Sequence, residues 1–207
     1  MILNFRFWNL DLSEVCGFGL FLLWEKVEND FMKVENVVLQ PTPNFSREIG
    51  FFLSGLEKVR KQWREAVVDL SKDELARKVF LEVQPIGTLI LHIAEGEYFW
   101  IQTVIQGEEM TEEIKNLLHY DMWFDDFASK DLDLQYCLNA VETVHELSRR
   151  ALTRFSDEDL EMTFVRQRED RESHCSLRWI LLHLIEHEAT HKGQIMMLKR
   201  LLRGGQS

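Results

Sequence analysis

Three histidines recur every four residues near the C-terminus, at His183, His187 and His191. Histidine is the commonest metal ligand, and its side chain titrates near neutral pH. A four-residue step places successive imidazoles on one face of a helix, where two neighbours can share one divalent ion. The outer two are eight residues apart, about 12 Å along a helix axis, so all three cannot bind the same ion. One of them must therefore have another role.

A helical wheel separates the three histidines. The surrounding residues 177–202 contain no proline and a single glycine, so they predict a helix. On that wheel His187 and His191 point the same way as Ile180, a core-type residue, whereas His183 falls on the flank of the apolar stripe. Packed, hydrogen-bonded core histidines are the alternative, but two aligned on an inward face carry a desolvation cost that a metal ion would offset. This pair is therefore the stronger ligand candidate.

The string from His187 to His191 also matches HExxH, the zinc-protease signature in which the glutamate, here Glu188, activates water. Such enzymes usually take a third ligand further along the chain, and residues 192–207 contain no His, Asp, Glu or Cys. They also need a substrate-binding sheet, and the chain has no convincing strand pattern. On the wheel Glu188 lies off the centre of the inward stripe. The sequence therefore does not favour a metalloprotease.

A third ligand must come from elsewhere, because catalytic zinc sites commonly use three protein ligands and leave a position for water or substrate. His92 is the best candidate because it lies among apolar residues of another predicted helix, although a histidine at the core boundary is the alternative. Glu95, on the same helix face, could orient a ligand, accept a proton or be an ordinary solvated carboxylate. His145 is a competing candidate, interpreted as a packed residue or a group behind the ligands. His119 and His174 fall in predicted connections and are expected to be solvated.

Four long amphipathic segments are expected to position these residues, and they predict an all-α four-helix bundle. The segments are residues 44–70, 85–106, 134–152 and 177–202. A capping-box pattern at Ser71–Glu74 opens a short helical turn. Residues 108–130 are interpreted as a connection with a short helix, and residues 156–176 as a polar crossover without strands.

Composition limits the class of protein. The chain of 207 residues is long enough for one domain with a full core, and 45% apolar with 29% charged residues is typical of a soluble globular protein. A net charge of −11 argues against a nucleic-acid partner, which needs a basic face. Three widely spaced cysteines, Cys16, Cys137 and Cys175, do not form a disulfide pattern and indicate a reducing cytoplasm. They are expected to be small buried apolar residues.

The N-terminal part differs from the rest of the chain. Residues 15–24 form an apolar run that is too short to span a bilayer, and the acidic residues before it argue against a secretory signal. Residues 1–40 are interpreted as an extension, and residues 41–207 as the bundle domain. The extension is either a docking helix or an upstream segment with Met32 as the natural start.

Two segments carry a resemblance to a known family. Residues 91–100, LHIAEGEYFW, and residues 187–195, HEATHKGQI, resemble the two signature regions of the DinB/YfiT-like superfamily. The second segment is the more specific, because of the Gly-Gln-Ile ending after the paired histidines. The resemblance covers roughly residues 41–203, which is nearly all of the chain apart from the N-terminal extension.

The resemblance implies a four-helix bundle with one divalent metal ion per chain, zinc or nickel, held by three histidines. Position by position, these are His92, His187 and His191. It further implies a homodimer with a small-molecule substrate and no membrane partner, and a metal-dependent S-transferase that uses a low-molecular-weight thiol. Three alternatives stay open: a metal-dependent hydrolase, a structural metal protein with His145 or His183 as a fourth ligand, and a metal-free packing module.

Overall fold

The computed structural model describes residues 37–120 and 127–204. The apolar run at residues 15–24, the alternative start at Met32 and Cys16 lie outside the described residues. The described residues from Leu39 onward belong to one compact unit.

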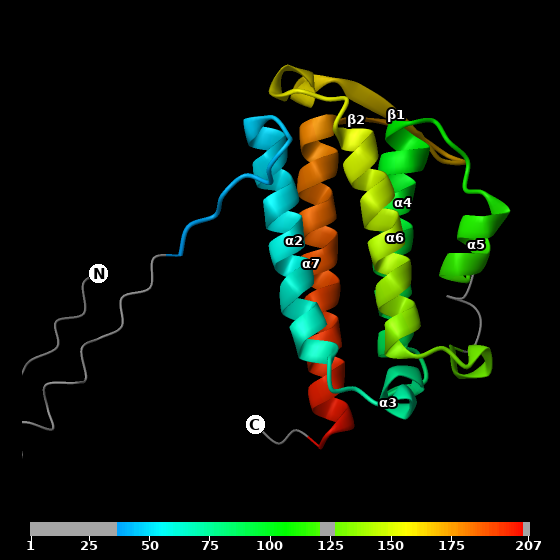
Figure 1. The fold of residues 1–207 in the computed structure, drawn as a ribbon. Coiled ribbons are helices and arrows are strands. Elements are labelled where there is room, and N and C mark those ends of the chain that lie inside the picture. The colour runs from blue at the N-terminus through cyan, green and yellow to red at the C-terminus, as the bar shows by residue number, and fades with distance from the viewer. Residues whose placement is uncertain (1–36, 121–126, 205–207) are drawn as a thin grey trace, which may run out of the picture. The chain divides into compact units, whose positions relative to one another are not determined.

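Within the described residues, four long helices run side by side as a bundle (Figure 1). They are α2 (Arg47–Val67), α4 (Ile86–Tyr98), α6 (Leu134–Leu152) and α7 (Leu177–Leu202). Helix α7 packs along both α2 and α4, and α4 also packs along α6. The prediction of an all-α four-helix bundle is confirmed, and α6 and α7 have the predicted bounds. No helix of the described residues is long and apolar enough to cross a membrane.

Short elements connect the long helices. Helix α4 continues into the π-helix η1 (Phe99–Ile105), so the predicted segment 85–106 is one helical rod with a change of winding. The others are α3 (Lys72–Ala76), α5 (Glu112–Leu118) and the 3₁₀ helices η2 (Phe127–Lys130) and η3 (Asp157–Glu161). The predicted capping box opens α3, because the Ser71 hydroxyl accepts from the Glu74 amide and the Glu74 carboxylate accepts from the Ser71 amide.

The expectation of a crossover without strands is wrong. Strand β1 (Thr163–Gln167) pairs antiparallel with β2 (Glu172–Ser176), and this hairpin lies across the end of the bundle where α7 begins (Figure 1). Each strand has five residues, and burial differs only modestly between its two faces. In β1, Phe164 packs on the core and Val165 is exposed. The polar composition hid this alternation, since one face of the hairpin is solvated.

Two histidines outside the predicted site differ from their expected surroundings. His174 is exposed as expected, but it lies in β2 rather than in a connection. His119 ends α5 in a left-handed conformation and is half-buried, with its ring 5.7 Å from that of Tyr136. The expectation that His119 is solvated is therefore wrong, and burial lowers its pKa.

The core consists of two apolar clusters. One contains Trp63, Ile90, Val141 and Leu198, and the other contains Leu53, Ile101, Leu152 and Leu181. At the boundary between them a hydrogen-bonded group of buried polar and charged residues takes one member from each long helix. These four residues, called the central polar layer below, are Arg60 of α2, Glu97 of α4, His145 of α6 and Glu188 of α7.

Candidate metal centre

The structure brings His92, His187 and His191 together. His92 lies on α4 and the other two lie on α7, which packs against it. The Nε2 atom of His187 lies 3.4 Å from Nε2 of His92 and 3.1 Å from Nε2 of His191. One possible ligand atom from each of the three lies within 4.8 Å of the others. The three imidazoles thus converge on one point.

Polar side chains behind two of the imidazoles fix their orientation. Nδ1 of His92 lies 3.2 Å from a carboxylate oxygen of Glu95, and Nδ1 of His191 lies 2.7 Å from the amide oxygen of Gln194. Because each acceptor takes a hydrogen bond from Nδ1–H, the lone pair of each ring is left on Nε2. Both acceptors stand three residues after their histidine, on the same helix face. Of the roles considered for Glu95, the contact with His92 supports that of orienting a ligand.

The third imidazole, His187, depends on a glycine of the facing helix. Its ring lies so close to Gly96 of α4 that a Cβ atom there would be 2.7 Å from the His187 Cε1 atom. Real Cβ atoms do not approach another atom so closely, so a larger residue at position 96 would displace the ring. Gly96 therefore lets α4 and α7 approach closely enough for the rings to meet.

The three imidazoles suit a divalent ion. Two nitrogens bound to zinc at tetrahedral angles are about 3.4 Å apart, close to the observed separations of 3.4 and 3.1 Å. Burial, together with the neighbouring His191, His92 and His183, lowers the pKa of His187 to about 3. Burial also lowers the pKa of His191. Both rings are therefore neutral at pH 7, and the facing lone pairs can be offset by a cation.

His183 does not join this group. Its ring stacks on Trp179 with centroids 4.8 Å apart and an interplanar angle of 7°, and its edge contacts Trp100 at 5.1 Å. The centroid of His187 lies 6.2 Å away. His183 is thus an aromatic wall residue beside the three converging rings.

Glu188 of the HExxH string points away from the converging imidazoles. Its carboxylate accepts hydrogen bonds from Arg60 Nε at 3.0 Å, from Arg60 Nη2 at 2.7 Å and from Trp63 Nε1 at 2.6 Å. The residue is 1% exposed. The helical wheel places Glu188 off the centre of the inward stripe. Helix α7 packs against α2 as well as α4, so a wider part of its surface is buried, and this part includes Glu188. A carboxylate held by three donors cannot serve as the base of a zinc protease.

The central polar layer continues from Glu188 across the bundle. Arg60 Nη2 also donates to Glu97 at 2.7 Å, and His145 Nδ1 lies 2.9 Å from the other Glu97 oxygen. His145 is therefore packed in this layer rather than beside the three converging imidazoles. Burial would raise the pKa of Glu97, but Arg60 and His145 outweigh it and lower the pKa to about 2.

The central polar layer was not predicted, although the sequence carries one signal for it. Arg60 falls on the apolar stripe of α2, at the helical spacing set by the buried Ile49, Leu53, Leu56, Trp63 and Val67. A long cation at a core position needs buried acceptors, because an unpaired buried charge is very unfavourable. The pattern thus called for buried carboxylates on other helices, although the helical wheel did not place Glu188 among them.

A cavity of about 590 Å³ opens beside His92 and His187. Its aromatic wall contains Phe99 and Trp100 of η1, and Arg166 of the hairpin also faces it. The remaining lining includes both acidic and basic side chains: Glu95, Glu109, Lys115 and Arg168. An aromatic hollow next to three converging imidazoles is the kind of place where a small organic molecule binds.

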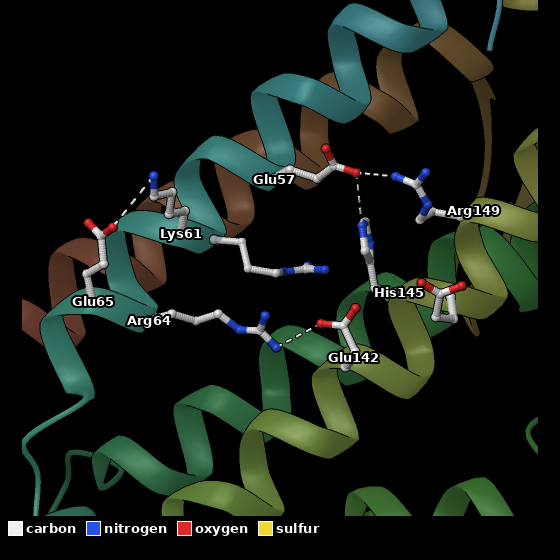
Figure 2. A pocket seen from close by; sticks show the side chains of 9 residues that line it. Glu57, Lys61, Arg64, Glu65, Glu142, His145 and Arg149 are labelled. Atoms are coloured by element: carbon white, nitrogen blue, oxygen red, sulfur yellow. Dashed lines mark hydrogen bonds and ion pairs between the residues drawn. The ribbon is translucent and has the colours of Figure 1, made fainter. Parts of the chain in front are cut away.

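A second cavity of about 380 Å³ lies between α2 and α6 (Figure 2). Figure 2 shows its charged walls paired across the gap: Arg64 with Glu142 at 2.9 Å, and Arg149 with Glu57. Glu57 also lies 3.4 Å from Nε2 of His145. These pairs bridge α2 and α6.

Comparison with known proteins places the fold and the family. The family model described as mycothiol-S-transferase matches residues 52–204, which include all three converging histidines. Among solved structures, a conserved protein from Enterococcus faecalis matches with a TM-score of 0.59 and 14% identity, over 74% of this chain and 95% of that chain. That likeness concerns the fold. No curated protein matches the chain.

Proposed function

Because the chain belongs to the mycothiol-S-transferase family, which is DinB-like, we propose that it is a metal-dependent S-transferase that joins a small-molecule thiol to an electrophile. The convergence of three imidazoles at the edge of an aromatic cavity carries this proposal. His92, His187 and His191 would hold one divalent ion, zinc or nickel. Imidazole donors suit both metals.

The proposed reaction needs a thiolate at neutral pH. A divalent ion bound by three neutral imidazoles supplies this by lowering the pKa of a thiol beside it. The thiolate sulfur then donates its electron pair to an electrophilic carbon. A C–S bond forms, the bond from that carbon to the leaving group breaks, and the thiol proton passes to solvent. The leaving group departs with the electron pair of the broken bond.

The chain's own residues would position the partners and limit the access of water. Glu95 and Gln194 hold two of the imidazoles in the orientation that presents Nε2. Phe99 and Trp100 give the reacting carbon an apolar wall, which places the two substrates side by side and lowers the local dielectric.

Two alternatives have less support. Hydrolysis by an HExxH mechanism needs Glu188 as a free base, and its carboxylate is bound by Arg60 and Trp63. A structural metal site usually closes with a fourth protein ligand. In the part of the chain that the structure describes, the two candidates for that position, His145 and His183, both lie outside the converging group.

Elemental analysis of purified protein tests the proposal, with His187→Ala and His183→Ala compared with the wild type. We expect about one zinc or nickel per wild-type chain, lost in His187→Ala and kept in His183→Ala. His183 is the matched control because it lies one turn away on α7 without joining the converging group. Equal metal content in the two variants, or none in the wild type after reconstitution, would contradict the site. Thiol consumption with an alkyl halide then tests the transfer reaction.

Assembly remains a prediction from the family resemblance, and location a prediction from the three widely spaced cysteines. We expect a cytoplasmic homodimer, with a mass about twice the 24.6 kDa of the chain. Light scattering coupled to size-exclusion chromatography measures this mass directly, and a monomer mass at micromolar concentration would contradict the dimer.

A further inference from the structure

We propose that Arg166 forms an anion subsite in the cavity beside the converging histidines, and that it binds a carboxylate group of one of the two substrates. The subsite deepens the proposed function, because it lies in the same cavity and would set the class of substrate. Nothing in the family match assigns a role to Arg166, which comes from strand β1 of the hairpin.

The Arg166 guanidinium is held in place by rings rather than by carboxylates. Its Cζ atom lies 5.3 Å from the centroid of Phe99 and 4.9 Å from that of Trp100. Its Nε is buried and has no hydrogen-bond partner among the described residues. By contrast, Arg178 donates from its Nε to Glu161 at 2.7 Å and from its Nη1 to Glu48 at 2.6 Å. Contact with both rings limits the movement of the guanidinium, and its outer N–H groups can match a planar oxyanion.

The surroundings of Arg166 are positive in a chain of net charge −11. Burial, followed by the nearby Arg168, lowers the pKa of Arg166, and Arg171 of the same hairpin acts in the same direction. Among the described residues no carboxylate forms an ion pair with Arg166, so a bound anion would relieve the repulsion between these arginines. The positive side of this cavity therefore favours an anionic ligand.

Size and charge indicate a monoanion. One guanidinium edge matches the two oxygens of a carboxylate. Glu95 and Glu109 also line the cavity and disfavour a second negative charge. About 590 Å³ is enough for a small organic molecule with an apolar or aromatic body.

A series of ring contacts joins Arg166 to the converging histidines. Trp100 lies under the guanidinium, and its ring centroid is 5.1 Å from that of His183. The ring centroid of His183 is in turn 6.2 Å from that of His187. A ligand with its carboxylate on Arg166 can therefore lay its apolar body along Trp100 and His183. Its reactive end would then reach the side of the cavity formed by His187.

A binding experiment tests the subsite without relying on activity. The probes are 3-phenylpropionate and its neutral isostere 3-phenylpropionamide, titrated into the full-length, zinc-loaded protein by calorimetry. We expect the acid to bind at least about tenfold more tightly than the amide, because a charged hydrogen bond is lost with the amide. In Arg166→Gln the affinity for the acid should fall to that for the amide. Arg166→Lys keeps the charge without the planar fork and should give an intermediate preference.

The control variant is Arg200→Gln, since Arg200 is an exposed arginine of α7 that does not line the cavity. It should leave the preference for the acid unchanged. Circular dichroism shows whether each variant is folded. An acid preference that survives in folded Arg166→Gln, or that Arg200→Gln removes equally, would overturn the proposal.

The same titration in His187→Ala separates the subsite from the proposed function. If His187→Ala still prefers the acid without bound metal, the subsite exists even if no S-transfer is found. If His187→Ala loses the preference for the acid, Arg166 is not an independent anion site. Activity then identifies which substrate carries the carboxylate. If it is the thiol, Arg166→Gln lowers kcat/KM for N-acetylcysteine more than for N-acetylcysteine amide. If the electrophile carries the carboxylate, Arg166→Gln lowers kcat/KM for 4-(chloromethyl)benzoate more than for 4-(chloromethyl)benzamide.

Discussion

Replacing Arg60 with alanine is expected to destabilise the protein far more than a typical substitution of a charged residue. Arg60 is 3% exposed and donates to two carboxylates, Glu97 and Glu188, which are 2% and 1% exposed. The substitution would leave both buried charges without their cation. Removing one partner of a buried ion pair costs about 3–5 kcal/mol.

The pKa of Glu97 gives a second estimate of this magnitude. Burial alone would raise it, but Arg60 and then His145 lower it from 4.5 to about 2. At about 1.4 kcal/mol per unit, this shift corresponds to roughly 3 kcal/mol of stability at pH 7. His145 contributes part of this shift.

The predicted loss depends on pH in a defined direction. The pKa of Glu97 is depressed in the folded state, so its contribution is present above the unfolded value of 4.5 and is lost as the pH falls towards 2. In Arg60→Ala, burial of Glu97 is opposed only by His145, so its pKa rises and the carboxyl group becomes protonated at a higher pH. The difference in stability between wild type and variant should therefore be largest near pH 7 and shrink below about pH 5.

Urea unfolding followed by circular dichroism, at pH 7 and at pH 4, measures both effects. Arg64→Ala is the matched control, since Arg64 lies four residues later on α2 and pairs with the half-exposed Glu142. That variant should change the free energy of unfolding by about 1 kcal/mol or less. A loss for Arg60→Ala no larger than for Arg64→Ala, or one that is independent of pH, would refute the reasoning.

Three further predictions concern the metal centre and the core. Gly96→Ala should weaken zinc binding in equilibrium dialysis, because the new methyl group meets the His187 ring, whereas Gly193→Ala, with no atom within 4 Å, should bind zinc normally. Zinc at 100 times its Kd should raise the free energy of unfolding of the wild type by about 2.7 kcal/mol, measured by thermal unfolding. A chelator should remove this gain, and zinc should not change the stability of His187→Ala. Burial raises the pKa of Cys137 to about 12, so iodoacetamide should label it only after unfolding; labelling of the native protein, read by peptide mass, would contradict this.

Local patterns explain the parts of the fold that were predictable. The bounds of α6 and α7 follow from a helical apolar period, and the start of α3 follows from its capping box. The spacing of His187 and His191 on one helix already indicated that both imidazoles share a face. These features involve residues within a few positions of each other, so short-range geometry decides them.

Other features depend on contacts between distant residues. His92 is 95 positions from His187, and spacing alone could not bring them together. Its apolar surroundings and the family resemblance named it as the third histidine, and the packing of α4 on α7 places it. The pairing of Arg60 with Glu188 likewise joins residues 128 positions apart. Helical periodicity specifies which face of a helix is buried, but not which helix covers that face. The sequence by itself thus determined the helices and the histidine pair, whereas the tertiary structure decided the central polar layer, the direction of Glu188 and the cavity beside Arg166.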